Sequence, residues 1–417
     1  MSTIDTTLEV LGITDQNIKV HEVRHETRTR SGRKREYLVI CADLSYGLTV
    51  CPHCQANGTL RPNGHKRTAI HVQSLVDRPV ILELNKQRWL CSACHHTTIA
   101  TTSLVGPRRS IANNIHKTVI KLAKDALPAS KIADITGISD TSVARILMAN
   151  IHPHAARHLP TELCFDEVRT THGNMSFICI DARTHKLVKM LGGRLNRDIK
   201  AFFTSQYSLA ERSQVHHIVM DMNASYQAIV HEVFPNAEVV FDRFHIVLML
   251  GRALDRVRID ILKTLDPHSR VRKALKSQWH LFHKTKLDAI HRKYRLGLNE
   301  YLTEQEVVSL ATNQFPELAA VYETYVAVHD ALMDGMPTTL EMLLVDYHAA
   351  HRTGVLLMDV VMRTLYKNRR GVVLASQSPL SNGPIEGVNR KIKELKRSGY
   401  GYANQQRMFV RIYQLTA

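Results

Sequence analysis

The chain has 417 residues, which is long enough for two or three domains and at least one large hydrophobic core. Lys and Arg number 55 against 38 Asp and Glu, so the formal charge is +17 and a polyanionic partner is expected. No apolar run is long enough to cross a bilayer, and the first residues lack the features of a signal peptide. We therefore expect a cytoplasmic protein in which the seven cysteines stay reduced.

The first 45 residues form an N-terminal segment that mixes a short helical pattern with a basic run, Arg28 to Arg35. Such a run fits either a surface hairpin or a nucleic-acid contact. A solvated loop is the simplest interpretation, and the sequence does not separate these alternatives.

Residues 46–100 contain two Cys-x-x-Cys pairs. The two-residue gap lets both thiolates of a tight turn reach one ion, and two such turns make a closed tetrahedral zinc site. Strand-like segments, Thr68–Leu75 and Val80–Leu90, separate the pairs as in a zinc ribbon. Buried free thiols or a redox pair are the alternatives, but the double spacing favours structural zinc. The predicted ligands are Cys51, Cys54, Cys91 and Cys94. Three nearby histidines could replace a cysteine ligand, but four cysteines already complete the set. They are His53, His95 and His96.

Residues 101–158 have helical patterning, and residues 130–147 look like a helix-turn-helix. Gly137 permits the turn, and Ser139 or Asp140 caps the second helix. The residues expected to pack inward are Ile132, Ala133, Ile135, Val143, Ile146 and Leu147. Those expected to point toward a major groove are Thr141, Ser142 and Arg145. A plain helical hairpin is the alternative, but the net charge favours DNA binding.

Residues 159–250 change to apolar strand patterns with interleaved helices, which predicts a mixed α/β domain. Asp166 follows the apolar segment Leu163–Phe165, and Asp221 follows Val215–Met220. We expect both acids at the C-terminal ends of strands, where polar functional groups emerge from a sheet. Two further acids are rivals for these positions, namely Glu167 and Asp242.

Residues 251–372 are helix-patterned and rich in Lys, Arg and His, without a strong strand signal. We predict an all-helical insertion between the sheet and a final helix region, residues 373–417. The basic faces of the insertion are either solvated surface or a platform for DNA.

The final region opens with a segment that is typical of a helix start. Gly383 can cap the helix, Pro384 suits its first position, and Glu386 falls in the first turn. Apolar residues at helical spacing predict a buried face made by Ile385, Val388, Ile392 and Leu395. Glu386, Asn389 and Lys393 share one side of the helix, where they could face a metal ion and a phosphodiester. A solvated, charge-rich helix is the alternative.

Three acids from separate elements, Asp166, Asp221 and Glu386, would make a hard-oxygen site suited to Mg²⁺ or Mn²⁺. In a two-metal arrangement, one ion activates water or a 3′-hydroxyl group and the other stabilises the leaving oxygen. Clustered carboxylates repel one another without cations, so we expect activity only with metal bound.

The order of these blocks resembles the insertion-sequence transposases of the ISL-three family, in the DDE superfamily with an RNase H-like catalytic core. The resemblance covers nearly the whole chain and includes FDEVRT at 165–170, DMNASY at 221–226 and FPNAEVVFDRFHIV at 234–247. It also includes the ribbon, the helix-turn-helix and the segment around Glu386. The resemblance implies Asp166, Asp221 and Glu386 as the catalytic acids.

The same resemblance implies that Lys393, seven residues after Glu386, contacts DNA. Further DNA contacts are expected from its neighbours Arg390, Lys396 and Arg397. Three further residues match the family blocks, namely Asp242, His245 and Asn389. We expect them to have only supporting roles, in packing or in contacts around the acids or with DNA.

The leading hypothesis is a prokaryotic, nucleoid-associated transposase that binds terminal inverted repeats and cuts and joins strands. Hydrolysis would expose a 3′-hydroxyl group that attacks target DNA, without a covalent protein–DNA intermediate. The expected partners are double-stranded DNA, from transposon ends and target, and further copies of the chain when two ends are paired. One alternative is a catalytically silent regulator derived from a transposase, which needs only the zinc and helix-turn-helix regions. Another is a structure-selective nuclease on the same core.

Overall fold

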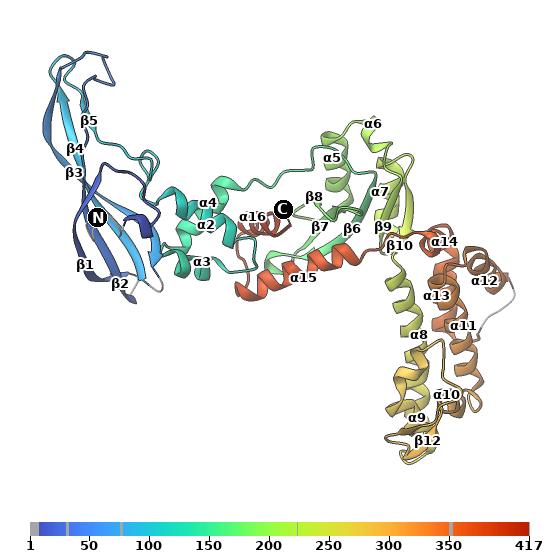
Figure 1. The fold of residues 1–417 in the computed structure, drawn as a ribbon. Coiled ribbons are helices and arrows are strands. Elements are labelled where there is room, and N and C mark those ends of the chain that lie inside the picture. The colour runs from blue at the N-terminus through green and yellow to red at the C-terminus, as the bar shows by residue number, and fades with distance from the viewer. Residues whose placement is uncertain (1–7, 31–32, 76–77, 223, 350–352, 417) are drawn as a thin grey trace. The chain divides into compact units, whose positions relative to one another are not determined.

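The computed structural model describes residues 8–416 except 31–32, 76–77, 223 and 350–352 (Figure 1). The chain divides into two compact units. The first unit comprises Met1–Pro153, Thr170–His172 and Arg390–Ala417, and the second comprises His154–Arg169 and Gly173–Asn389.

A β-sheet dominates the start of the first unit. Among the described residues its strands are β1 (Ile18–Arg30), β2 (Arg33–Leu44), β3 (Leu60–Leu75), β4 (Arg78–Cys91) and β5 (Thr97–Ile99). The order is β1-β2-β4-β3, with β5 on β4, and the central β2–β4 pair is parallel. The predicted strands lie within β3 and β4, so their prediction is confirmed.

The described residues of the basic run at 28–35 form the end of β1 and the start of β2, so they are strand and not loop. Arg28 pairs with Arg35 and Thr29 with Lys34 in the antiparallel β1–β2 hairpin. The turn residues 31 and 32 lie outside the described chain. The hairpin alternative is therefore confirmed over the solvated loop, and a nucleic-acid contact by the same run stays a prediction.

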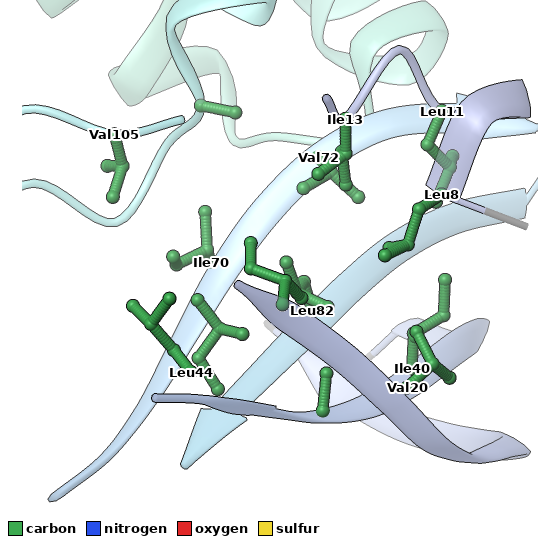
Figure 2. Close-up of a cluster of buried hydrophobic side chains, with 14 of the residues drawn as sticks. Leu8, Leu11, Ile13, Val20, Ile40, Leu44, Ile70, Val72, Leu82 and Val105 are labelled. Atoms are coloured by element: carbon green, nitrogen blue, oxygen red, sulfur yellow. The ribbon is translucent and has the colours of Figure 1, made fainter. Parts of the chain in front are cut away.

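One face of this sheet is buried by alternating apolar side chains, as the two-residue period of a strand requires. Ile40, Ile70 and Leu82 have no more than 1% of their surface exposed and pack with Leu44 in a single cluster (Figure 2). The opposite face of β4 presents Ile81 to a separate small cluster. Together these two clusters account for the nearly continuous burial of β4.

Helices complete the first unit. They are α2 (Asn113–Leu122), α3 (Ala129–Thr136), α4 (Asp140–Asn150), α16 (Gln405–Thr416) and the C-terminal part of α15 (Gly383–Ser398). Gly137 between α3 and α4 has φ +72°, and a Cβ there would lie 2.8 Å from the Cβ of Pro79. Ser139 caps α4 by accepting a hydrogen bond from Ser142 N. The expected turn and cap are both present.

The inward residues of this helical pair are largely as predicted. Val143, Ile146 and Leu147 of α4 are buried. On α3, the prediction for Ile135 is wrong: half of this side chain is exposed. The buried positions of α3 are Ile132, Ala133 and Thr136, which are spaced so that Ile135 lies to one side of their shared face.

The sequence predicts that residues 373–417 belong with the catalytic core, but only the part up to Asn389 lies in the second unit, and Arg390–Ala417 belong to the helical group of the first unit. Ser398 Oγ donates to the Ala126 carbonyl at 2.8 Å, and Gln414 Nε2 donates to the Ile120 carbonyl at 2.9 Å. The buried Arg411 donates to the Leu127 carbonyl at 2.6 Å. These contacts join positions more than 270 residues apart, which local sequence patterns do not report.

The second unit contains a mixed sheet with interleaved helices. Among the described residues the strands are β6 (Glu162–Arg169), β7 (Met175–Asp181), β8 (Leu187–Met190), β9 (His217–Met220) and β10 (Glu238–Phe241). The order is β10-β9-β6-β7-β8; β6, β7 and β8 are antiparallel, while β6, β9 and β10 are parallel. The associated helices are α5 (Asn196–Gln206), α6 (Leu209–Arg212) and α7 (Ala224–Val233). A short 3₁₀ turn, η1 (Thr171–Gly173), follows β6 along the chain, and its first two residues belong to the first unit. The predicted mixed α/β domain is confirmed.

A helical body follows β10 in the second unit (Figure 1). Its helices are α8 (Arg243–Thr264), α9 (Arg270–Ser277), η2 (Trp279–His283), α10 (Glu304–Thr312), α11 (Pro316–Met333), α12 (Pro337–Ala349), α13 (Leu356–Lys367) and α14 (Arg369–Gln377). The prediction of an all-helical insertion is wrong in one respect, because β11 (Lys293–Arg295) and β12 (Glu300–Leu302) form a hairpin. Strands of three residues are too short to show an alternating pattern. No helix in the described part of the chain is both long and apolar enough to span a membrane.

Helix α14 packs closely on β10 through a glycine. A Cβ on Gly371 would lie 2.6 Å from the Phe241 ring and 2.8 Å from the Val239 carbonyl oxygen. We expect Gly371→Ala to lower the free energy of unfolding by about 1–3 kcal/mol, because the helix must move away from the strand. Chemical denaturation of the full chain measures this loss.

Gly387 provides the matched control, since it also lies in a helix but a Cβ there would contact nothing within 4 Å. Gly387→Ala should leave stability unchanged or raise it by up to about 1 kcal/mol. Equal stabilities of the two variants would contradict the packing argument.

Candidate functional sites

The four predicted zinc ligands converge. Their sulfur atoms all lie within 4.8 Å of one another, with Cys51 Sγ 3.7 Å from Cys94 Sγ and Cys54 Sγ 3.7 Å from Cys91 Sγ. A tetrahedral zinc ion with Zn–S bonds of about 2.3 Å would separate its sulfur ligands by about 3.8 Å. The cluster therefore has the dimensions of a closed structural zinc site.

The two cysteine turns have the same backbone geometry. Gln55 N donates to the Cys51 carbonyl and His95 N donates to the Cys91 carbonyl, both at 2.9 Å. Gln55 and His95 both have positive φ angles, of 62° and 57°. The Thr59 hydroxyl group lies 3.2 Å from Cys91 Sγ, and this contact together with the Cys94 backbone N–H lowers the pKa of Cys91 to about 6. A lower pKa favours the thiolate, which is the form that binds metal.

Asp166 lies inside β6 and not at its end, so the predicted position was wrong in detail. The strand continues because β6 pairs with β7 as far as Arg169, with Asp166 opposite Ile178. On its other side, the pairing of β6 with β9 ends at Cys164. Asp166 therefore still lies just past the parallel pairing, as Asp221 does when it follows Met220 at the end of β9.

Asp166 is held by two hydrogen bonds. Its Oδ1 accepts from the Glu167 backbone N–H at 2.7 Å, and its Oδ2 accepts from Asn389 Nδ2 at 2.6 Å. Burial raises the pKa of Asp166 to about 6, and the nearby Asp221 carboxylate adds to the increase. Asn389 belongs to α15, so this bond attaches the start of that helix to β6.

Asp221 lies beside a second carboxylate and a histidine. His245 Nδ1 is 2.8 Å from Asp221 Oδ1 and 3.0 Å from Asp242 Oδ2. Hydrogen bonds to Asp221 and Asp242 raise the pKa of His245 to about 10. Asp242 is 4% exposed, and its Oδ1 accepts from the Asn382 backbone N–H at 3.3 Å. The three ligand atoms of Asp221, Asp242 and His245 lie within 4.8 Å of one another, close enough to share a metal ion.

The rival acid Glu167 is occupied by other partners. Arg194 Nη1 donates to its Oε2 at 2.7 Å and Tyr226 Oη donates to its Oε1 at 2.9 Å. The carboxylates of Glu167 and Asp166 both accept two hydrogen bonds, but Glu167 is ion-paired with Arg194, whereas the two donors to Asp166 are neutral amides. The negative charge of Asp166 is therefore the more available to a cation. Tyr226 lies in the DMNASY block, but no sequence signal pointed to Arg194.

A cavity of about 640 Å³ brings most of these groups together. Its lining includes Asp166, Glu167, Asp221, His245 and two cationic side chains, Arg194 and Arg252. Arg252 was not singled out in the sequence, although it lies on the same helix as His245, two turns further along. The arrangement combines acids that can hold cations with arginines that can bind an anion.

Glu386 is half-buried in the first turn of α15, three residues before Asn389, and it is not among the described side chains that line this cavity. Glu386 shares a side of the helix with Asn389, which is the residue that donates to Asp166. The apolar face predicted for α15 is confirmed, since Ile385, Ile392 and Leu395 are fully buried and Val388 is 8% exposed.

The predicted DNA-contacting side chains are mostly accessible. Thr141 and Arg145 are exposed on α4, whereas Ser142 is half-buried and its Oγ lies 2.9 Å from the capping Ser139 Oγ. On α15, the exposed residues are Arg390, Lys393 and Arg397, and Lys396 is half-buried. These α15 residues belong to the first unit, while Glu386 and Asn389 belong to the second.

Two segments of the chain, which contain the acidic cavity residues and the cysteine cluster, match known protein families. Residues 163–412 match a family described as transposase, the ISL3 type. This chain belongs to the ISL-three (ISL3) transposase family. Residues 48–94 match the zinc-finger of transposase IS204/IS1001/IS1096/IS1165, in agreement with the four-cysteine cluster.

A curated relative of this ISL3 transposase is the transposase for insertion sequence element IS1001 of Bordetella parapertussis. The two are 22% identical over 368 residues, which cover 86% of this chain and 87% of the relative. Membership of the family implies a nucleotidyl-transferase activity, and the zinc-finger match implies DNA binding. The predicted transposase family and zinc ribbon are therefore confirmed.

Proposed function

We propose that this transposase binds the terminal inverted repeats of an insertion sequence and catalyses metal-dependent strand cleavage and strand transfer. The main support for this proposal is the cavity that Asp166 and Asp221 both line. Asp166 is also hydrogen-bonded to Asn389, which lies on the helix that bears Glu386. Acids from positions 166, 221 and 386 would form the catalytic triad. Two copies of the chain would act together when two transposon ends are paired.

The topology of the second unit supports this assignment. Three antiparallel strands, β6 to β8, are extended on one side by the parallel strands β9 and β10. This order is that expected of an RNase H-like core, with the first acid on the central strand and the second after its parallel neighbour. The helical body between β10 and α15 is then an insertion into that core.

The residues present fit a magnesium or manganese ion. Besides the carboxylates of Asp166 and Asp221, the buried Oδ1 of Asn389, whose Nδ2 donates to Asp166, has no hydrogen-bond partner among the described residues. A buried oxygen without a hydrogen-bond partner raises the free energy of the folded state unless a donor or a cation binds it. Hard oxygen donors are the ligands that Mg²⁺ and Mn²⁺ prefer. Asp166, Asp221 and Glu386 would hold the metal, which when bound supplies a Lewis acid for phosphoryl transfer.

The chain's own groups would position the DNA. Arg194 and Arg252 line the cavity and can bind the phosphodiester, while Asn389 orients Asp166. In the first step water adds to phosphorus, the bond to the 3′-oxygen breaks, and a 3′-hydroxyl group is released. In the second step that hydroxyl attacks a target phosphodiester, so one phosphorus–oxygen bond forms as another breaks.

DNA recognition would fall to the first unit. Helices α3 and α4 would form a helix-turn-helix in which Thr141 and Arg145 point toward the major groove. Arg390, Lys393, Lys396 and Arg397 on α15 would contact phosphates. The zinc ribbon would add a further DNA-binding module that is folded by its metal.

Asn389 offers a test of how Asp166 is oriented. We expect Asn389→Ala to raise the Mn²⁺ concentration that gives half-maximal cleavage and to lower the cleavage rate roughly 10- to 100-fold. Loss of a side chain that orients a metal ligand typically reduces metal affinity or activity by this factor. Metal titration of a cleavage assay measures both quantities. The exposed Glu394→Gln on the same helix is the control and should behave as wild type. An unchanged metal requirement in Asn389→Ala would contradict the orienting role.

A catalytically silent DNA-binding regulator is the second candidate, and the position of Glu386 outside the cavity lining favours it. The deciding experiment incubates the purified protein with labelled DNA that carries the flanking inverted repeats, with and without Mg²⁺. A transposase releases 3′-hydroxyl ends and joins them to target DNA. A regulator binds the same DNA without cutting it, and a structure-selective nuclease cuts without joining.

A further inference from the structure

The β11–β12 hairpin of the second unit exposes two aromatic side chains on one face. Tyr294 and Tyr301 lie opposite each other in the strand register, with ring centroids 5.4 Å apart. They are 51% and 67% exposed. The other face carries the buried Arg295 and Leu302 and, at the start of β11, the exposed Lys293. The two tyrosines form the outward pair.

The hairpin does not need this pair in order to be held in place. Arg295 Nε donates to the Leu302 carbonyl, and Gln278 Nε2 donates to the Leu296 carbonyl at 3.1 Å. A Cβ on Gly297 would lie 2.9 Å from Ser277, so the turn also packs closely on the end of α9. These contacts fix the hairpin against α9 and η2. The exposed rings are therefore available for a partner.

More exposed apolar surface surrounds the hairpin. Trp279 of η2, next to the bonded Gln278, is 50% exposed, and Leu296 in the turn is 77% exposed. Single exposed apolar side chains are normal on a protein surface, but several of them gathered on one element mark an interaction site. We name this surface, made by Trp279, Tyr294, Leu296 and Tyr301, the aromatic tip.

The charge around the aromatic tip indicates the partner. Residues 270–302 contain nine Lys and Arg but two Asp and Glu. Several of these cations are neutralised by acids, as in the pairs Arg270–Glu300 and Arg292–Glu306. Lys276 and Lys293 are exposed and form no ion pair with any described residue. A positively charged surface with exposed aromatic rings fits a nucleic acid, because phosphates pair with lysine and bases stack on tyrosine.

We propose that the aromatic tip binds unpaired bases of DNA, with Tyr294 and Tyr301 as the stacking platform and Lys276 and Lys293 as phosphate contacts. This inference rests on the proposed function, which supplies DNA as the substrate. A fully paired duplex offers no free base face away from its ends, so single-stranded DNA is the preferred form. None of the residues of the aromatic tip lines the acidic cavity.

The test measures binding of full-length protein to a fluorescent 20-nucleotide oligothymidine and to a blunt duplex of the same length. The double variant Tyr294→Ala/Tyr301→Ala should bind the oligothymidine roughly ten-fold or more weakly, since stacking on an aromatic ring contributes strongly to each bound base. Its affinity for the blunt duplex should change less than two-fold. The matched variant Tyr294→Phe/Tyr301→Phe keeps both rings and should bind as wild type.

Salt dependence gives a second readout. Lys276→Ala/Lys293→Ala should reduce the slope of log affinity against log salt by about 1.4 for the oligothymidine, at about 0.7 per phosphate contact. Lys263→Ala removes an exposed lysine of α8 that is paired with Asp260, and should leave the slope unchanged. Thermal unfolding of each variant verifies that the fold is retained.

Two results separate this inference from the proposed function. Wild-type protein that neither binds nor cuts DNA would remove the proposed function itself. Suppose instead that wild-type protein cuts DNA and the double alanine variant binds oligothymidine as tightly as wild type. That result would contradict the binding role of the aromatic tip and leave the proposed function standing. Equal losses on single strand and duplex would also overturn it, because stacking on unpaired bases would then not be the cause.

Discussion

Asp221→Asn should abolish strand cleavage while leaving DNA binding intact. The substitution keeps the size of the side chain and removes the negative charge that would hold the metal ion beside Asp166. Loss of charge stabilisation worth several kcal/mol corresponds to a rate loss of roughly a thousand-fold or more, at about 1.4 kcal/mol for each factor of ten. Cleavage of labelled inverted-repeat DNA in Mg²⁺ measures the rate, and a gel-shift assay measures binding.

Asp260→Asn is the matched control for this experiment. Asp260 is about half exposed on α8 and pairs only with Arg256 and Lys263 among the described residues, away from the cavity lining. Its substitution should leave cleavage within about two-fold of wild type, as exposed ion pairs contribute little. If Asp221→Asn cut DNA as fast as Asp260→Asn, the acidic cavity would not be the catalytic site.

Removal of zinc should unfold the start of the first unit. Structural zinc contributes about 10–16 kcal/mol of apparent binding free energy at neutral pH, which is comparable to the whole stability of a typical domain. Cys91→Ser should therefore lower the zinc content to well below one ion per chain and lose cooperative unfolding of the ribbon. Atomic absorption measures the zinc content, and circular dichroism during chelation measures the unfolding.

His53→Ala is the control that distinguishes a four-sulfur site from one with a histidine ligand. His53 is exposed and stacks on His96, with ring centroids 4.6 Å apart, but neither belongs to the metal-binding group of the described residues. The variant should retain one zinc ion per chain. A loss of zinc equal to that of Cys91→Ser would show that the ligand set is wrong.

Much of the local structure was predictable because it depends on short-range patterns. The turn at Gly137 and the cap at Ser139 are formed by residues a few positions apart. The buried face of α15 follows from its helical period. The β11–β12 hairpin was missed because three-residue strands carry no period, and Ile135 was misassigned because adjacent positions on a short helix differ in burial.

The candidate site was predictable in its residues but not in its contacts. Asp166 and Asp221 could be proposed because each follows an apolar segment of the sequence, and both line one cavity. The hydrogen bond from Asn389 to Asp166 spans 223 positions and had no local signal. The same is true of the ion pair between Arg194 and Glu167, which neutralises the charge of Glu167 and leaves that of Asp166 available to a cation.

The sequence by itself indicated the four cysteines that cluster, the turn at Gly137 and the family to which the chain belongs. Spacing and period encode these features within a few residues, or in the order of short blocks. Only the tertiary structure decided that the C-terminal helix joins the helical group near the N-terminus, that Glu167 is occupied, and that Tyr294 and Tyr301 remain uncovered. Those outcomes depend on which surfaces pack together once the cores form, and that is a property of the whole chain.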